Sequence, residues 1–185
     1  MTSKKLIYYN PDEFYALTQF RHDFLEFLKK NHKKNQPLVL LCIGTDRVTG
    51  DCLGPLIGQS LIDSSIYSIY GTLQNPVHAQ NLDQTIDIIL DSYKNPFIIA
   101  IDSCLGIEEH IGYITLSSMP LNPGQGVCKK LRSIGNLSIT GIVDVFSKEN
   151  LDAIQNTRLK TVFRLASFIK NGIENPKSQA SYPLL

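Results

Sequence analysis

The sequence lacks the long apolar segments that would place it in or across a membrane. No apolar run approaches the ~18 residues of a membrane-spanning helix. The N-terminus, MTSKKLIYYNPDEF, has no apolar stretch of the kind found in secretory signals. We therefore expect an intracellular, cytoplasmic protein with no membrane partner.

The sequence also has little net charge and no closely spaced pair of cysteines. The formal net charge is +1, so no overall field attracts nucleic acid, and we expect no direct nucleic-acid partner. The cysteines are far apart in the chain and form no CxxC pair: Cys42, Cys52, Cys104 and Cys128. This spacing argues against a structural zinc site and against a disulfide scaffold. The histidines show no metal-ligand spacing either, and we expect no cofactor.

The chain is long enough for one domain with a substantial core. It has 185 residues, of which 43% are hydrophobic, and it contains no repeat or linker that would divide it. We predict a single domain over 1–185, with an N-terminal helix at 11–31, a core at 37–171 and a flexible tail at 175–185. Asn10 is the predicted N-cap of the first helix, with Pro11 at its first position.

Two continuously apolar runs, 37–44 and 96–101, predict central parallel strands with helices on both faces. Shorter strands are predicted at 66–71, 112–116 and 137–142, the second of them antiparallel through a hairpin at EEHIG. Helical periodicity predicts helices at 53–61, 82–90 and 144–171. This alternation indicates an α/β fold with a mostly parallel sheet.

Two aspartates follow the two apolar runs. Asp51 lies in the loop after the first run, and Asp102 directly follows the second. If these strands are neighbours, both carboxylates lie at the carboxyl end of the sheet, where ligands bind in open α/β folds. Two nearby carboxylates can divide the roles of acid and base in hydrolysis, and they can also bind a divalent cation.

Other interpretations of these residues stay open at this point. Asp51 is also a plausible helix N-cap, and Asp46 is more typical of a loop-shaping residue. A cysteine nucleophile, Cys104 or Cys52, could pair with His78, although no spacing supports it. The PGQG segment at 123–126 could offer backbone N–H groups to an anion or a peptide, but it is not a P-loop.

The segments CIGTDRVTGDCLGPLIG, AIDSCLG, NPGQGV and SITGIVDV, in this order, closely resemble the YyaC-like family of small sporulation proteins. That family is similar to the germination protease of spore-forming bacteria, an atypical aspartic endopeptidase that degrades small acid-soluble spore proteins. It is more distantly similar to the hydrogenase maturation endopeptidases. The resemblance implies a three-layer α/β/α sandwich of the phosphorylase/hydrolase-like kind.

The resemblance also implies a site. VTGDCLGP matches the VTPD-A-LGP motif of the germination protease and assigns its first catalytic aspartate to Asp51. AIDS matches AIDA and assigns the second to Asp102, with Ser103 next to it as a substrate-binding residue. PGQGV matches the PGSGV loop and implies substrate binding by Gly124, Gln125 and Gly126.

Four positions depart from the patterns of these relatives. Gly50 replaces a proline, Asn122 replaces a histidine, Cys128 replaces a glycine, and Ser138 stands where the maturation peptidases have a nickel-binding histidine. The missing histidine argues against a nickel site, so we expect no metal.

The function expected from this resemblance is a sporulation-associated endopeptidase with an aspartate pair, acting in the sporulating cell or spore core. Its expected partner is a protein substrate, with small acid-soluble spore proteins as candidates, and a homo-oligomer is compatible with the sequence. The alternatives are a non-catalytic binding or regulatory protein with the same fold, and a metal-dependent hydrolase.

Overall fold

The computed structural model describes residues 5–123, 132–146 and 153–174, which contain a six-stranded sheet. Its order is β1-β5-β6-β4-β2-β3. Neighbours among β6, β4, β2 and β3 are parallel, whereas β5 is antiparallel to both β6 and β1. The strands are β1 (Leu6–Tyr9), β2 (Leu38–Cys42), β3 (Ser68–Tyr70), β4 (Phe97–Gly106), β5 (Ile114–Ser117) and β6 (Leu137–Val145).

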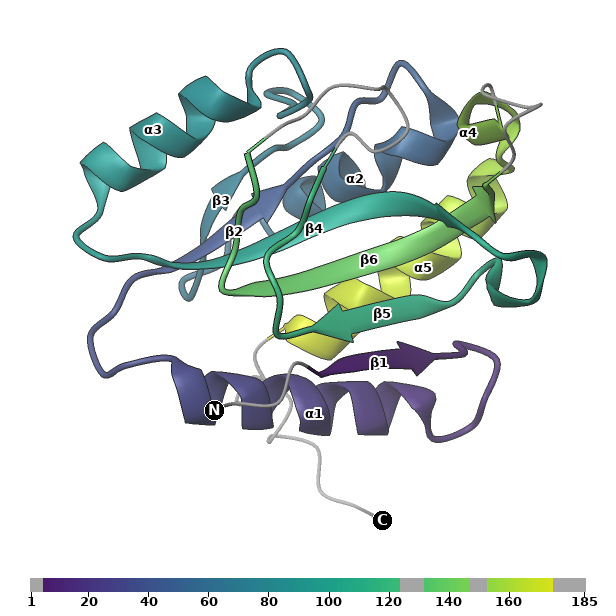
Figure 1. Cartoon of the computed structure of the whole chain (residues 1–185), viewed down its shortest axis with the longest axis horizontal. Coiled ribbons are helices and arrows are strands. Elements are labelled where there is room, and N and C mark those ends of the chain that lie inside the picture. Colours follow the sequence, from purple (N-terminus) through teal and green to yellow (C-terminus); the bar gives the residue numbers. More distant parts are fainter. Residues whose placement is uncertain (1–4, 124–131, 147–152, 175–185) are drawn as a thin grey trace.

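Helices lie on both faces of this sheet. α1, α2 and α5 pack on one face and α3 on the other (Figure 1), which confirms the predicted three-layer α/β/α architecture. No helix within the described ranges is both long and apolar enough to cross a membrane. The helices are α1 (Ala16–Asn31), α2 (Leu53–Ser60), α3 (Leu82–Ser92), α4 (Ala153–Asn156) and α5 (Leu159–Ile173), and the short 3₁₀ turns are η1 (Thr49–Cys52) and η2 (Glu108–His110).

β2 and the first half of β4, up to Ile101, are apolar throughout because both of their faces are buried. On β2, Leu40 and Cys42 pack with the α2 and α5 layer, while Val39 and Leu41 pack under α3. β2 and β4 are parallel, as predicted, and they are neighbours, as the site hypothesis assumed, with Leu38 opposite Phe97. Their carboxyl ends therefore meet at the same edge of the sheet.

The first helix begins later than predicted. α1 starts at Ala16, and its N-cap residue is Tyr15, not Asn10. The Asn10 side chain instead accepts a hydrogen bond from the Asp12 N–H (3.1 Å) and stabilises a turn. Strand β1, which precedes this turn, was not predicted, because it is a four-residue edge strand with mostly exposed side chains.

The region around β6 also differs from the prediction. β6 extends to Val145, so residues 144 and 145, predicted as helical, are in a strand, and the described helices of the predicted stretch are α4 and α5. β5 is antiparallel, but it pairs with β6 rather than forming a hairpin with β4. Because β6 is inserted between them, η2 is part of a crossover and not a hairpin turn. The predicted tail at 175–185 lies outside the described residues.

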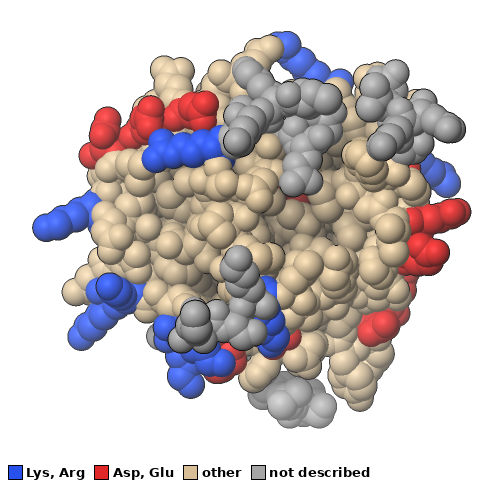
Figure 2. All heavy atoms as spheres, viewed as in Figure 1, with Lys and Arg blue, Asp and Glu red and all other residues tan. Residues whose placement is uncertain are grey.

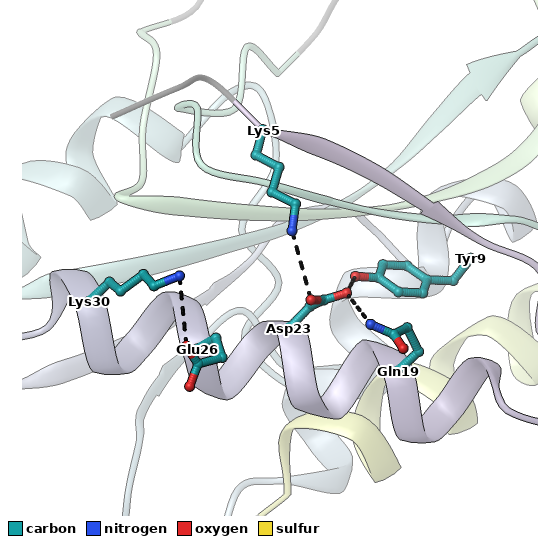
Figure 3. A network of polar contacts seen from close by, with 6 residues as sticks. All are labelled: Lys5, Tyr9, Gln19, Asp23, Glu26 and Lys30. Atoms are coloured by element: carbon teal, nitrogen blue, oxygen red, sulfur yellow. Dashed lines mark hydrogen bonds and ion pairs between the residues drawn. The ribbon is translucent and has the colours of Figure 1, made fainter. Parts of the chain in front are cut away.

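A polar network anchors β1 on α1. The Tyr9 hydroxyl donates to Asp23 Oδ2 (2.8 Å), Gln19 Nε2 donates to the same oxygen (3.1 Å), and Lys5 Nζ lies 3.8 Å from Asp23 Oδ1 (Figure 3). Burial and the charge of Asp23 raise the pKa of Tyr9, so the hydroxyl keeps its proton as a donor. Asp23 thus connects the edge strand to the helix beside it.

Asp23→Ala should lower the free energy of unfolding by about 1–3 kcal/mol, because the buried Tyr9 hydroxyl loses its acceptor. Glu26→Ala is the matched control on the same helix. Glu26 contacts only exposed lysines (3.7 Å to Lys30 Nζ), so this change should stay within about 0.5 kcal/mol of wild type. Urea denaturation of both variants measures the difference. Equal losses would contradict a special role for Asp23.

Candidate active site

A tight loop places Asp51 beside β4. Gly44, just after β2, has φ +138°, and a Cβ at this position would lie 2.0 Å from the Asp51 carbonyl oxygen. The same carbonyl accepts a hydrogen bond from the Thr45 N–H (3.0 Å). Glycine is needed here for both its φ and its lack of a side chain. The loop therefore folds back, and Asp51 lies in η1 at the carboxyl end of β2.

Asp51 is not the N-cap of the following helix. The N-cap residue of α2 is Cys52, and no side chain makes a capping hydrogen bond there. The carboxyl group of Asp51 therefore does not cap the N-terminus of α2.

Asp102 lies within β4, not after its end as the sequence indicated. Pairing between β2 and β4 ends at Cys42 and Ile101, whereas β4 continues to Gly106 alongside β6. Asp102 is thus the first residue of β4 beyond the end of β2. Its side chain is on the α3 face, the same face as Ala100, and it is 8% exposed. The missing continuation of β2 leaves space that η1 and Asp51 occupy.

The two carboxyl groups share one buried environment. Burial raises the pKa of Asp102 well above its usual value, the charge of Asp51 raises it further, and the Ser103 N–H, which donates to Asp102 Oδ1 (2.8 Å), opposes both effects. Burial raises the pKa of Asp51 to about 6, and the nearby Thr45 N–H and Ser103 hydroxyl oppose that shift. Near neutral pH the pair therefore holds one proton, mainly on Asp102.

Ser103, predicted to bind substrate, affects the pKa values of both aspartates. Its side chain is on the opposite face of β4 from Asp102, and it is buried. Its hydroxyl is close enough to lower the pKa of Asp51, yet Oγ has no partner at hydrogen-bond geometry among the described residues. It is better placed to favour ionised Asp51 than to contact a substrate.

The described residues do not fit a metal centre. No group of three or more His, Cys, Asp or Glu side chains within them is arranged to hold an ion. Ser138, which replaces the nickel-binding histidine, donates its hydroxyl to the Met119 carbonyl (2.9 Å). The donor set near Asp51 and Asp102 therefore lacks a third ligand within the described part of the chain.

The pKa values of the Cys104 and Cys52 thiols do not support a cysteine nucleophile. Burial is the main cause that raises the pKa of Cys104, to about 11, and burial likewise raises the pKa of Cys52. A reactive cysteine needs a lowered pKa. His78 Nδ1 accepts a hydrogen bond from the Gln80 N–H (3.3 Å) in the turn before α3, so this nitrogen is not available as a base for a thiol.

A groove adjoins the aspartate pair. It has a volume of about 790 Å³ and lies on the α3 face, over β6, β5 and β1, where none of the described helices covers the sheet. Figure 2 shows that Lys, Arg, Asp and Glu side chains surround the rim of this face, while uncharged residues form most of its centre. Asp102 is not part of the groove wall, but its same-face neighbours Cys104 and Thr140 are.

A row of hydroxyl groups forms the floor of this groove. Thr140 lies opposite Asp102 in the sheet; its Oγ1 is 2.7 Å from Thr115 Oγ1 and accepts from the Cys104 thiol at 3.4 Å. Sequence reasoning did not identify these residues as functional. The signal was the alternation of polar and apolar residues in ITLS and LSIT, which indicates a sheet face without an apolar cover.

The substitution of proline by Gly50 has a steric cause. A Cβ on Gly50 would lie 2.4 Å from the Ile154 carbonyl oxygen of α4 and 2.8 Å from Thr157 Oγ1. α4 therefore packs directly on the backbone of η1, and a proline ring does not fit. The predicted substrate-binding residues Gly124, Gln125 and Gly126 lie outside the described residues.

Together, the fold and the site define an α/β protein with a buried carboxyl pair at the carboxyl ends of its central parallel strands. Residues 8–172 match the family described as "Protein of unknown function (DUF1256)", and the chain belongs to this family. It is also 44% identical over 140 residues to the uncharacterized protein YyaC of Bacillus subtilis (strain 168), an overlap that covers 75% of this chain and 68% of the relative. This confirms the resemblance to the YyaC-like family.

Asp102→Asn should stabilise the protein at neutral pH. The pKa of a buried aspartate is higher in the folded than in the unfolded chain, so folding above the unfolded value of about 4 carries a cost that disappears as the pH falls. We expect a gain of the order of 1–3 kcal/mol at pH 7.5, shrinking towards pH 4. Urea denaturation across this range measures it.

The exposed Asp46, in the same loop as Asp51, provides the control. Asp46→Asn should leave both the stability and its pH dependence near those of wild type. A loss of stability in Asp102→Asn at pH 7.5 would contradict the assignment of a buried, mainly protonated carboxyl group.

Proposed function

We propose that this chain is an endopeptidase in which Asp51 and Asp102 activate water for hydrolysis of a peptide bond. The observation that carries the proposal is the division of roles within the pair: burial and mutual repulsion leave one carboxyl group protonated and the other ionised near pH 7. A structural role would not require a buried Asp102 and a partly buried Asp51 without a cationic partner among the described residues.

In the proposed mechanism Asp51 is the base and Asp102 the acid. The Asp51 carboxylate takes a proton from a water molecule, whose oxygen attacks the peptide carbonyl carbon. Protonated Asp102 donates a hydrogen bond to the carbonyl oxygen as charge develops there. Collapse of the tetrahedral intermediate breaks the C–N bond, and the leaving amine takes a proton from the pair. Because the groups are coupled, their apparent pKa values belong to the pair.

The surroundings of the pair favour catalysis over a purely binding role. A non-catalytic relative should have its carboxylates tied up by backbone N–H groups or basic side chains, with no open cleft beside them. Asp102 does accept a hydrogen bond from the Ser103 N–H (2.8 Å), but the other two features differ. Within the described residues neither Asp51 nor Asp102 forms an ion pair, and the groove begins at the neighbours of Asp102. The donor set does not favour a metal-dependent hydrolase.

The proposed biological setting comes from the resemblance to sporulation proteins and to the germination protease. We propose that the enzyme acts in the sporulating cell or spore core on protein substrates, with small acid-soluble spore proteins as the first candidates. This setting is separate from the chemistry and is tested by the choice of substrate.

The direct test is incubation of the full chain with purified small acid-soluble spore proteins. Wild type should cleave them, and Asp51→Asn and Asp102→Asn should each reduce the rate by about 100-fold or more. Asp46→Asn should cleave like wild type. Mass spectrometry of the products measures rate and cleavage position. If both site variants cleave as wild type does, the mechanism is wrong; if wild type leaves these proteins intact, the substrate assignment is wrong.

The pH dependence of cleavage should be bell-shaped. The rate should fall as the pH decreases through about 6, because protonation of Asp51 removes the base. It should fall again at higher pH as Asp102 loses its proton. Initial rates between pH 4 and pH 9 measure the profile. A rate that is constant from pH 4 to pH 7 would exclude Asp51 as the base.

A further inference from the structure

The groove beside the aspartate pair follows the direction of β6. Its wall includes Ser138 near the start of that strand and Val145 at its end. These residues are seven positions apart, which corresponds to about 23 Å of extended chain. A compact small molecule would occupy a fraction of this length, whereas an extended peptide of about seven residues would fill it.

The groove floor suits an uncharged peptide backbone. Hydroxyl groups of Thr115 and Thr140 can both donate and accept hydrogen bonds, as peptide N–H and C=O groups require. No Lys or Arg is among the described residues that line the groove, whereas Glu108 and His110 line it and the aspartate pair adjoins it. The charge of the site therefore disfavours phosphates, nucleic acids and acidic side chains.

One end of the groove is apolar and exposed. Ile107 and Phe146 are 56% and 57% exposed, and a hydrogen bond from the Phe146 N–H to the Gly106 carbonyl (2.8 Å) joins the segments that carry them. Both line the groove together with Val145. Large apolar side chains that are exposed next to a cleft are typical of a binding site.

We infer that this groove holds the substrate as an extended peptide segment, with a bulky apolar side chain against Ile107 and Phe146 and no acidic side chain along its length. The inference rests on the proposed peptidase function and specifies its substrate class. The hydroxyl groups of Thr115 and Thr140 align the backbone of the bound peptide. Because Thr140 lies opposite Asp102 in the sheet, the peptide then lies beside the aspartate pair.

Binding can be measured without catalysis in the Asp102→Asn variant, which should hold a peptide uncleaved. The probe is an N-acetylated, C-amidated heptapeptide of alanine and threonine with one central phenylalanine. A comparison peptide carries glutamate in place of the phenylalanine. The partly exposed Cys104 thiol in the groove reports occupancy, because a bound peptide should slow its alkylation by iodoacetamide. Mass spectrometry of the fragment that contains Cys104 distinguishes it from the other cysteines.

We expect the phenylalanine peptide to protect Cys104 and the glutamate peptide to leave its alkylation rate unchanged. Phe146→Ser should weaken binding of the phenylalanine peptide about tenfold, since a bulky side chain loses its apolar contact. The matched control is Phe163→Ser on α5, because Phe163 is 63% exposed but does not line the groove. This variant should bind like the parent, and circular dichroism checks that both variants fold.

Charge selection has its own matched pair of variants. Glu108 lines the groove and its neighbour Glu109, also exposed, does not. Glu108→Gln should improve binding of the glutamate peptide a few-fold at low salt, and the effect should fade at high salt because ions screen exposed charges. Glu109→Gln should change it less.

The outcomes separate this inference from the proposed function. Suppose that wild type cleaves a protein, but the phenylalanine peptide does not protect Cys104 or binds equally to Phe146→Ser and Phe163→Ser. The groove is then not the substrate site, and the peptidase assignment stands. If the peptide protects Cys104 and Phe146→Ser abolishes protection, the groove binds extended peptide even where no cleavage occurs. Equal protection by the glutamate peptide would overturn the exclusion of acidic segments.

Discussion

The site depends on a difference in length between two neighbouring strands. β4 continues for five residues beyond its last partner in β2, and Asp102 is the first of these. Without a continuing β2, the chain after Gly44 folds into the vacated position and brings Asp51 to the same place. Two carboxyl groups thus share a space too buried for both to ionise easily. The acid–base properties of the pair follow from this backbone arrangement.

Unequal cover of the sheet places an open surface next to the pair. α3 packs on the β2 and β4 half of one face through an apolar cluster, while the β6 and β5 half of that face carries hydroxyl groups. The opposite face is closed by α1, α2 and α5 (Figure 1). The larger apolar cluster therefore lies on the α1, α2 and α5 side, whereas none of the described helices covers the β6 and β5 half of the opposite face.

The sequence predicted the central features well because strong local signals coincide there. Two apolar runs predicted β2 and β4 as central parallel strands, and the assumption that they are neighbours placed Asp51 near Asp102. The sequence did not predict that β4 extends past Asp102, because the polar Asp102 and Ser103 interrupt the apolar run there. β1 was missed because an edge strand is exposed on alternate residues, and Thr140 was overlooked because its importance arises from its register opposite Asp102.

The close contact between Gly50 and α4 means that the residue at position 50 and the segment around Ile154 constrain each other's substitutions. The carbonyl group of Ile154 occupies the space that a side chain at position 50 would need. A relative with proline in the VTPD form of this motif must therefore place the segment equivalent to α4 elsewhere. Substitutions at these two positions should be correlated among relatives, because a larger residue at position 50 needs the space that the Ile154 carbonyl group occupies in this chain.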